Sequence, residues 1–368
     1  MGKPIRVLHV VGGLGTGGIQ SVLIELYRHI DRSKVQFDFV VHIKSKKSYA
    51  SEVESLGGIV YYIDNDAFEH RKWGKYILFW KKFYKEHPEY RIVHGHLRST
   101  AAIYLWEAKK SGCITIAHSH NTTNGYGRSA RIKDVLQFPV RHIADYCLGC
   151  SEEANEWMFG KSRSNSKTCT VLRNGIEVGK YTFREEYRVS LRRELGYQDT
   201  DIVIGNVGRL VAQKNQKILI EALRFLHEPY KLMLVGDGSL RQNLQEQISD
   251  CKLESRVIML GSRDDVYKLL SAMDIFALPS QNEGLAIAAI EAQASGLPTL
   301  VSTAVPKDGY VTPLAVCVQG KTAADWAEAI QQISASERIS FSDQITNAGY
   351  NICDSAERLQ NLYLSILK

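Results

Sequence analysis

Short apolar segments alternate with longer amphipathic segments along the whole chain. The apolar segments are rich in β-branched residues, which is typical of strands buried on both faces of a parallel sheet. The amphipathic segments have helical length and spacing, so the alternation predicts parallel sheets covered by helices on both faces. In the first half the expected strands lie at 5–11, 37–42, 58–63, 92–94, 115–118 and 146–149.

The same pattern begins again after a turn signal at Arg173-Asn174-Gly175. Further expected strands lie at 203–207, 231–235, 257–260, 275–278, 299–302 and 315–318. A chain of 368 residues is longer than one hydrophobic core usually supports. We therefore expect an α/β protein of two doubly wound units: residues 1–173 with a C-terminal helix at about 355–368, and residues 174–350.

Ligands of such sheets bind beyond the carboxyl ends of the strands, so the residues that follow strands are the candidates for a site. After the first strand comes a glycine-rich loop, residues 12–18, which leads into a helix. Gly17 and Gly18 would let backbone N–H groups approach a diphosphate closely. A dehydrogenase would also need an acid at the end of the second strand, whereas Asp38 falls at its beginning, which disfavours that class.

Two glutamates follow the fourth strand of the second half. Glu283 is predicted at the entrance of a helix and Glu291 two turns later, a span of about 12 Å. The prediction is that Glu291 binds ribose hydroxyls and Glu283 the hydroxyls of a sugar, while the N–H groups of Gly284, Leu285 and Ala286 face a diphosphate. Alternatively, Glu283 caps the helix and Glu291 lies on a solvated face. An unpaired charge in the Ala- and Ile-rich run around Glu291 would be costly, which favours a ligand.

Two cations follow the first strand of the second half. Arg209 can bind two phosphate oxygens at once through its guanidinium, and Lys214 can supply a mobile point charge, so both are suited to stabilise a departing diphosphate. Alternatively, both are ordinary surface cations. Because they would supply the positive charge, we expect no metal and no cofactor besides a nucleotide diphosphate-sugar as donor substrate. The triplets Asp64-Asn65-Asp66 and Asp199-Thr200-Asp201 are interpreted as loop acids.

These motifs together resemble the donor site of the retaining glycosyltransferases of family 4. The resemblance rests on Gly208-Arg209 with Lys214-Asn215, on Pro279-Ser280, on Glu283 and Glu291 with seven residues between them, and on Gly296-Leu297-Pro298. It extends to the glycines of residues 12–18, to Asn174-Gly175-Ile176 and to Leu260-Gly261, and it is strongest to bacterial members that build exopolysaccharide and capsular polysaccharide. Many relatives carry Phe-Gly where this chain has Leu285-Ala286, and Glu where it has Gln20.

The resemblance implies the GT-B fold: two facing Rossmann-like domains with a C-terminal helix that crosses back to the first. It also implies metal-independent transfer with retention of anomeric configuration, in which the leaving phosphate accepts the proton of the acceptor. A histidine after a strand of the first domain would reach the donor sugar. By position His120 is the first candidate and His118 the second, and His96 is expected on the acceptor side.

The expected function is transfer of a hexose or N-acetylhexosamine from a UDP-sugar to a lipid-linked or polysaccharide acceptor in cell-surface polysaccharide biosynthesis. The alternatives are a nucleotide-sugar epimerase or hydrolase on the same fold, and a binding module without catalysis. The motifs leave the sugar, the base and the acceptor open.

Charge and cysteine content bear on where the protein works. Residues 1–175 hold 26 Lys/Arg and 16 Asp/Glu, a net of +10, and the remainder hold 20 and 24, a net of −4. The chain has no signal-peptide pattern and no apolar run that could span a bilayer, which predicts a cytoplasmic protein. Nucleic acid is disfavoured because no recognition motif accompanies the basic half. The seven cysteines are interpreted as reduced, and the C-x-x-C pair of Cys147 and Cys150 as buried structural residues.

A basic aromatic segment, residues 71–85, predicts peripheral contact with the inner face of the plasma membrane. In that interpretation Trp73 and Phe83 stay exposed at the margin of the helix. Alternatively, Ile77, Trp80 and Tyr84 form the apolar stripe of a helix that simply covers the sheet.

Overall fold

The computed structural model describes residues 3–15, 18–45, 48–63, 73–121, 127–333 and 338–367. The chain forms two compact units. The first comprises Met1–Gly175 and Ile352–Lys368, and the second comprises Ile176–Asn351. The sequence had predicted the boundary at residue 173 and the C-terminal helix from about residue 355.

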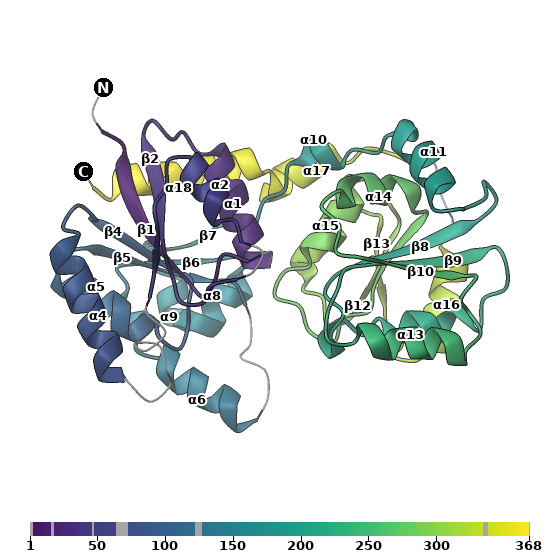
Figure 1. The fold of residues 1–368 in the computed structure, drawn as a ribbon, viewed down its shortest axis with the longest axis horizontal. Helices are drawn as coiled ribbons and strands as arrows, with labels where there is room; N and C mark the ends of the chain where they lie inside the picture. The colour runs from purple at the N-terminus through teal and green to yellow at the C-terminus, as the bar shows by residue number, and fades with distance from the viewer. Residues whose placement is uncertain are drawn as a thin grey trace. The chain divides into compact units, whose positions relative to one another are not determined.

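The first unit is built on a parallel seven-stranded sheet of order β3-β2-β1-β4-β5-β6-β7 (Figure 1). Its strands are β1 (Ile5–Val11), β2 (Val35–Val41), β3 (Val60–Tyr62), β4 (Ile92–Gly95), β5 (Ile114–Ser119), β6 (Tyr146–Gly149) and β7 (Cys169–Val171). The direction of the strand order reverses between β1 and β4, so the loop after β1 and the loop after β4 lead away from each other.

Helices cover both faces of this sheet. They are α1 (Gly18–His29), α2 (Ala50–Ser55), α4 (Trp73–Glu86), α5 (Ala101–Lys110), α6 (Arg128–Gln137), α7 (Val140–Ile143), α8 (Glu152–Phe159), α9 (Lys161–Ser164) and the C-terminal α18 (Ile352–Ser365). The helix α18 packs on α1, which places the end of the chain in the unit where the chain begins.

The second unit has a parallel six-stranded sheet of order β10-β9-β8-β11-β12-β13, with its reversal between β8 and β11. The strands are β8 (Ile202–Val207), β9 (Tyr230–Val235), β10 (Val257–Gly261), β11 (Ile275–Leu278), β12 (Thr299–Ser302) and β13 (Ala315–Val318). The helical segments are α10 (Val178–Tyr181), α11 (Glu185–Glu194), η1 (Ala212–Lys214), α12 (Lys217–Leu223), α13 (Arg241–Asp250), α14 (Val266–Ala272), α15 (Ile287–Ala294), η2 (Lys307–Gly309), α16 (Ala323–Gln332), α17 (Ser342–Ile345) and η3 (Thr346–Tyr350).

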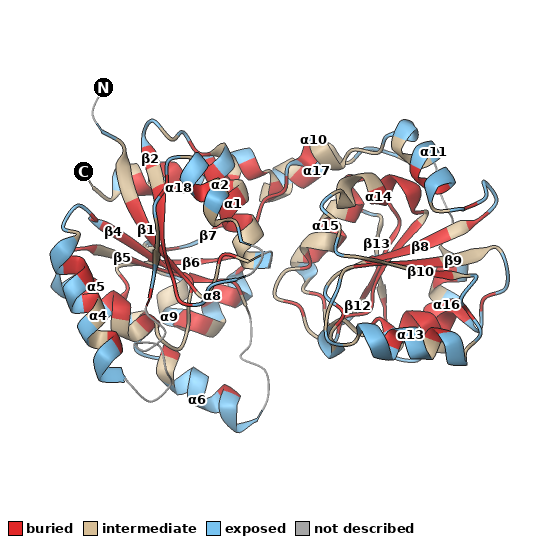
Figure 2. Cartoon of the chain, viewed as in Figure 1, coloured by how far each residue is buried: buried red, intermediate tan, exposed pale blue. Residues whose placement is uncertain are grey.

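The two parallel sheets confirm the predicted fold class. All twelve predicted strands form, and β1, β6, β11, β12 and β13 have the predicted bounds. The sequence missed β7, a three-residue strand at the sheet edge whose central residue is exposed. In Figure 2 buried residues run along the strands and exposed residues lie on the outward faces of the helices.

The helix α4 corrects one expectation about the basic aromatic segment. Tyr76, Trp80, Phe83 and Tyr84 share one stripe and are all buried against the sheet, so the predicted exposure of Phe83 is wrong. Trp73 is exposed as predicted, while Arg71 and Lys72 lie outside the described residues, as do Asp64 and Asp66.

Asp38 is a structural residue of the first unit. It is fully buried in β2, and its carboxylate accepts hydrogen bonds from the Arg6 guanidinium, from the amide of Ile59 at 2.7 Å and from the Tyr90 hydroxyl at 2.9 Å. A carboxylate with these partners is not available to a ribose, which agrees with the argument against a dehydrogenase.

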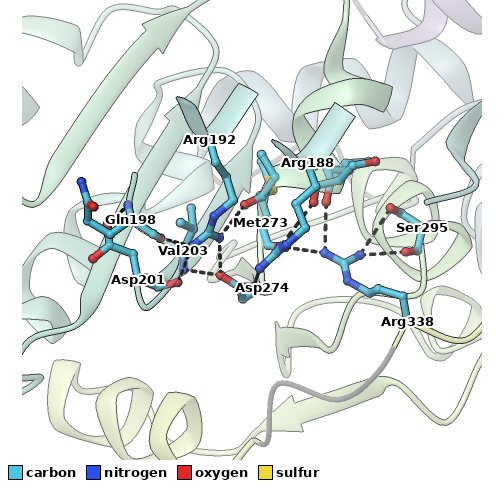
Figure 3. A network of polar contacts seen from close by, with 12 residues as sticks. Arg188, Arg192, Gln198, Asp201, Val203, Met273, Asp274, Ser295 and Arg338 are labelled. Carbon is cyan, nitrogen blue, oxygen red and sulfur yellow. Dashed lines mark hydrogen bonds and ion pairs between the residues drawn. The ribbon is translucent and has the colours of Figure 1, made fainter. Parts of the chain in front are cut away.

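Asp274 organises the second unit at the amino end of β11 (Figure 3). Its carboxylate accepts hydrogen bonds from Arg188 at 2.7 Å, from Arg192 at 3.0 Å and from the amide of Val203 at 2.8 Å. Nearby, Arg338 donates to backbone carbonyls that include those of Ser295 and Met273. This network ties α11 to β8 and β11 at the end of the sheet opposite to their carboxyl ends.

The remaining expectations concern cysteines, loop acids and membrane spans. Cys147 and Cys150 are buried and form no disulfide, as predicted. Asp201 lies in the loop before β8, where its carboxylate accepts a hydrogen bond from the amide of Gln198 at 2.8 Å. Among the described residues no helix is long and apolar enough to cross a bilayer.

Candidate active site

The candidate site of the second unit is built on the loops that follow β8 and β11. These strands are neighbours at the point where the strand order reverses, which is where open parallel sheets leave room for a ligand. The loop after β8 carries Arg209 and Lys214, and the loop after β11 carries Glu283. The structure therefore brings Lys214 and Glu283 together although they lie 69 residues apart in the sequence.

Lys214 and Glu283 form an ion pair that joins the two loops. The Nζ of Lys214 donates to Oε1 of Glu283 at 2.5 Å, and the exposed fractions of the two side chains are 20% and 6%. Such a pair is screened little by water, so its geometry is held more firmly than that of a surface pair. The alternative that Glu283 caps a helix is not supported, because in the described residues its carboxylate pairs with Lys214 and caps no helix amide.

Hydrogen bonds to backbone groups also connect the loops after β8 and β11. The amide of Gln281 donates to the carbonyl of Gln213 at 2.8 Å, and the Gln213 side chain returns a bond to the carbonyl of Asn282 at 2.7 Å. Asn215, which has the left-handed φ of 52°, donates through its side chain to the carbonyl of Pro279 at 3.3 Å. Asparagine tolerates that backbone conformation better than most residues, so Asn215 can end η1 while its side chain contacts the loop after β11.

A third loop, after β9, packs closely on the first. A Cβ atom on Gly236 would lie 2.0 Å from the carbonyl oxygen of Gly208, and Gly236 has a φ of +136°. Only glycine allows this approach. The amide of Leu210 then bonds the carbonyl of Asp237 at 3.0 Å, so the segment that carries Arg209 is held by its neighbours on both sides.

Arg209 is the exposed cation of this edge. Its carbonyl accepts a hydrogen bond from the side chain of Gln216 at 2.9 Å, which fixes the backbone. Within the described part of the chain its guanidinium forms no ion pair, so it can bind an anion without first losing a partner.

The helix α15 begins at Ile287, two residues later than predicted. Among the described residues no backbone carbonyl accepts from the amides of Gly284, Leu285 or Ala286, and their contact with a diphosphate stays a prediction. The methyl group of Ala286 is buried in the core of the unit, so only the backbone of Ala286 is available there. The helix ends at Ala294, and Gly296, with φ of +69°, follows two residues later in the predicted Gly-Leu-Pro stop.

Glu291 has a partner that the sequence did not indicate. The hydroxyl of Tyr181 in α10 donates to Oε1 of Glu291 at 2.7 Å, and Glu291 is half-buried. Tyr181 precedes Glu291 by 110 residues, and no spacing or motif connects them. The predicted contact of Glu291 with ribose stays a prediction, and Tyr181 joins it as a hydrogen-bond partner of the carboxylate.

In the first unit, Gly17 lies outside the described residues and Gly18 is the exposed first residue of α1. The predicted histidines lie at and just beyond the carboxyl ends of β4 and β5. His96, His118 and His120 are all buried, and His120 is the most exposed of the three at 8%. Burial lowers the pKa of His120 to about 3, with the Arg98 charge as a further cause, so the ring is neutral at pH 7.

The sequence missed His9 and Tyr363, which join the same cluster. His9 in β1 is aligned with His94 in β4, and the hydroxyl of Tyr363 in α18 lies 2.6 Å from Nδ1 of His94. Two groups in the described residues, His9 with His94 and His96, and His96 with His118 and His120, bring ring nitrogens within 4.8 Å of one another. Imidazole is a common metal ligand, so these are the residues that could hold an ion.

Two sequence profiles match almost the whole chain. Residues 16–180 match the profile described as Glycosyltransferase Family 4, and residues 188–352 match that described as Glycosyl transferases group 1. The chain belongs to glycosyltransferase family 4. Its two parallel-sheet units are those of the GT-B fold, as the sequence predicted.

Relatives and solved structures agree with this assignment. EpsF of Bacillus subtilis, provisionally named a glycosyltransferase, is 29% identical over 97% of this chain and 96% of its own length. A galactosyltransferase of Escherichia coli, named for UDP-Gal and α-D-GlcNAc-diphosphoundecaprenol, is 27% identical over 58% of each chain. HepE of Anabaena, solved with UDP and glucose, is similar with a TM-score of 0.78 and 19% identity, covering 98% of this chain and 100% of its own. The epimerase or hydrolase alternative is not favoured.

The ion pair between the loops generates a prediction about stability. We expect Lys214→Met to lower the free energy of unfolding by about 3 kcal/mol, because it leaves Glu283 charged and buried without its partner. Glu283→Gln should cost less, since the lysine can turn to water, and the double variant should be no less stable than Lys214→Met. Urea unfolding of the wild type, the two single variants and the double variant measures this cycle.

Glu228→Gln is the matched control, because the glutamate of its ion pair is 61% exposed, and it should cost at most about 1 kcal/mol. If the losses of unfolding free energy in the two single variants simply add up in the double variant, the pair does not couple the loops.

Proposed function

We propose that this family 4 enzyme is a metal-independent, retaining glycosyltransferase that uses a UDP-sugar. The transferred group is a hexose or N-acetylhexosamine, and the acceptor is a lipid-linked or polysaccharide glycan of cell-surface polysaccharide biosynthesis. The observation that carries the proposal is the arrangement around the Lys214–Glu283 pair. There a partly buried ion pair, an exposed arginine and three amides that have no backbone acceptor among the described residues gather on two adjoining loops.

These groups match the parts of a nucleotide diphosphate-sugar. Arg209, Lys214 and the amides of residues 284–286 suit the diphosphate, since charged donors and backbone N–H groups both bind phosphate oxygens. Glu283 suits the sugar hydroxyls and Glu291, oriented by Tyr181, suits the ribose hydroxyls, because carboxylates accept hydrogen bonds from both.

In the proposed reaction the bond between the anomeric carbon and the β-phosphate oxygen breaks, and a bond from that carbon to the acceptor oxygen forms. The acceptor proton goes to the leaving phosphate on the same face of the sugar, which retains the anomeric configuration. Arg209 and Lys214 stabilise the charge that develops on the phosphate, and His120 contacts the donor sugar. No separate base is required in this scheme.

The choice of donor and acceptor is supported by the relatives. HepE was solved with UDP and glucose, and the Escherichia coli relative is named for a UDP-sugar and a diphosphoundecaprenol-linked acceptor. We extend both chemistries to this chain as part of the proposal.

Removal of the exposed arginine should separate turnover from binding. We expect Arg209→Ala to lower kcat by about 10²- to 10³-fold while the Kd of the UDP-sugar changes much less, because its charge matters most as the phosphate departs. Glu291→Gln should abolish transfer mainly by weakening the donor complex. Transfer kinetics and calorimetric titration of the donor measure the two effects, and Arg224→Ala, an exposed arginine of the same unit, is the matched control.

The same assay tests the independence from metal. Transfer should continue in excess EDTA, because cationic side chains and amides take the place of the ion. Full activity of Arg209→Ala would remove the assignment of the donor site. Loss of wild-type activity on chelation, restored by Mn²⁺, would contradict the metal-independent mechanism alone.

We also propose that the first unit contacts anionic membrane, where a lipid-linked acceptor would lie. The helix α6 and its C-cap residue, Phe138, expose a row of apolar side chains: Ile132, Val135 and Phe138 have exposed fractions of 60%, 72% and 53%. Arg128, Arg131 and Lys133 accompany them, and α4 adds the exposed Lys81 and Lys82. Apolar side chains among cations suit the headgroup region, and each cation adds about 1 kcal/mol near an anionic surface.

Sedimentation with vesicles tests this contact. The protein should pellet with phosphatidylglycerol vesicles at low salt, stay in solution with phosphatidylcholine alone, and be released by salt. Ile132→Ser with Val135→Ser, and separately Lys81→Glu with Lys82→Glu, should each weaken binding several-fold. Lys217→Glu with Lys321→Glu in the second unit is the matched charge control. Equal recovery in solution with both kinds of vesicle would favour a soluble acceptor.

A further inference from the structure

Five buried histidines occupy one face of the central strands of the first unit. His9 of β1 pairs in register with His94 of β4, and His96, His118 and His120 follow at every second position along β4 and β5. Alternate residues of a strand share a face, so all five rings point to the same side of the sheet. Their exposed fractions are 8% or less.

Three of these rings form a continuous hydrogen-bonded chain. Nδ1 of His9 lies 3.0 Å from Nε2 of His96, and Nδ1 of His96 lies 2.9 Å from Nε2 of His120. The two end atoms, Nε2 of His9 and Nδ1 of His120, are buried and have no hydrogen-bond partner among the described residues. The chain thus runs from the middle of β1 to the histidine that the proposed function assigns to the donor sugar.

Burial keeps all three rings neutral. It lowers the pKa of His9 and of His120 to about 3, and that of His96 well below its usual value. A neutral imidazole carries one N–H donor and one bare acceptor nitrogen. Each contact needs one of each, so the chain has only two arrangements: all three rings protonated on Nε2, or all three protonated on Nδ1. The tautomer of His120 is therefore tied to that of His9.

The surroundings of the two ends favour the first arrangement. His9 packs among Phe37, Phe39 and Tyr363. The two phenyl rings offer no donor to a bare nitrogen, whereas aromatic rings can accept an N–H weakly, so these surroundings suit a protonated Nε2 of His9 better than a bare one. At the other end the positive charge of Arg98 helps to lower the pKa of His120. Because Nε2 of this ring is bonded to His96, that charge disfavours a further proton on the remaining nitrogen, Nδ1.

We propose that His9 and His96 are positioning residues that hold His120 as its Nε2–H tautomer and so present its Nδ1 as a hydrogen-bond acceptor. This inference rests on the proposed function for the identity of the ligand, which is a hydroxyl group of the donor sugar. A hydroxyl can donate to a bare nitrogen, whereas the other tautomer would present an N–H and reverse the direction of the bond.

A metal ion in the cluster is the competing account, and the ring orientations disfavour it. The lone pairs of an imidazole lie in the plane of the ring, so two ligands of one ion cannot be stacked face to face. The rings of His118 and His120 are stacked at 4.0 Å between centroids with an interplanar angle of 29°. Ligands of tetrahedral zinc also stand about 3.3 Å apart, as follows from Zn–N distances of about 2.0–2.1 Å, which is wider than the two hydrogen bonds of the chain.

Nitrogen NMR of protein labelled with ¹⁵N-histidine tests the tautomers directly, without any donor bound. A bare and a protonated ring nitrogen resonate far apart, and single-histidine variants assign the signals. The proposal predicts the Nε2–H form for His9, His96 and His120 alike. An Nδ1–H form at any of the three, or stoichiometric binding of Zn²⁺ or Co²⁺ that shifts their signals, would overturn it. An inactive enzyme with the predicted tautomers would instead fault the proposed function.

Variants of His9 test the coupling along the chain. His9→Phe removes the acceptor of His96, and loss of a hydrogen bond of ordinary strength should change the tautomer ratio of His120 about 5-fold or more. His9→Asn places an amide oxygen near the position of Nδ1 and should preserve the wild-type ratio. Tyr363→Phe is the matched control, because it deletes an equally buried hydrogen bond, to His94, outside the chain.

In transfer assays His9→Phe should lower kcat, and His9→Asn and Tyr363→Phe should retain it. An unchanged His120 tautomer in His9→Phe, or an equal shift in Tyr363→Phe, would overturn the proposal. If His9→Phe does not fold, the spectra of the wild type and of His9→Asn decide it.

Discussion

The ion pair between Lys214 and Glu283 is the contact on which the proposed donor site depends. Two loops that leave neighbouring strands in a parallel sheet have no backbone ladder between them. Here one backbone hydrogen bond, from Gln281 to Gln213, joins them, and side chains supply the other contacts that set their spacing. The main side-chain contact is this partly buried charge pair, helped by the bonds of Gln213 and Asn215 to the opposite loop. The pair also keeps a cation and a carboxylate side by side, so the loops are preorganised for a ligand that carries both phosphate and hydroxyl groups.

The residues that stabilise each unit are separate from those that could bind a ligand. Asp274 and its arginines act at the amino ends of β8 and β11, whereas Arg209, Lys214 and Glu283 lie beyond the carboxyl ends. Asp38 in the first unit is likewise enclosed by its partners within the fold. This division lets the exposed loop residues be substituted with little effect on the sheets, and Lys214 is the exception because it serves both purposes.

Local patterns were sufficient to predict the sheets but not the contacts between distant segments. Runs of β-branched residues located twelve strands. Only β7 was missed, because a half-exposed strand of three residues is too short to show a hydrophobic pattern. The spacing of Tyr76, Trp80, Phe83 and Tyr84 is that of one helical stripe, so the burial of Phe83 could have been deduced from periodicity alone. By contrast, the contact of Tyr181 with Glu291 and the register of His9 against His94 depend on tertiary structure that no spacing in the sequence encodes.

Hydrogen–deuterium exchange with and without a UDP-sugar tests the central claim, that the loops after β8 and β11 bind the donor. The account predicts slower exchange in residues 208–216 and 280–291, with the amides of residues 284–286 among the most protected, and loss of this protection in Arg209→Ala combined with Glu291→Gln. Protection confined to other segments, with both loops unchanged at saturating donor, would contradict it.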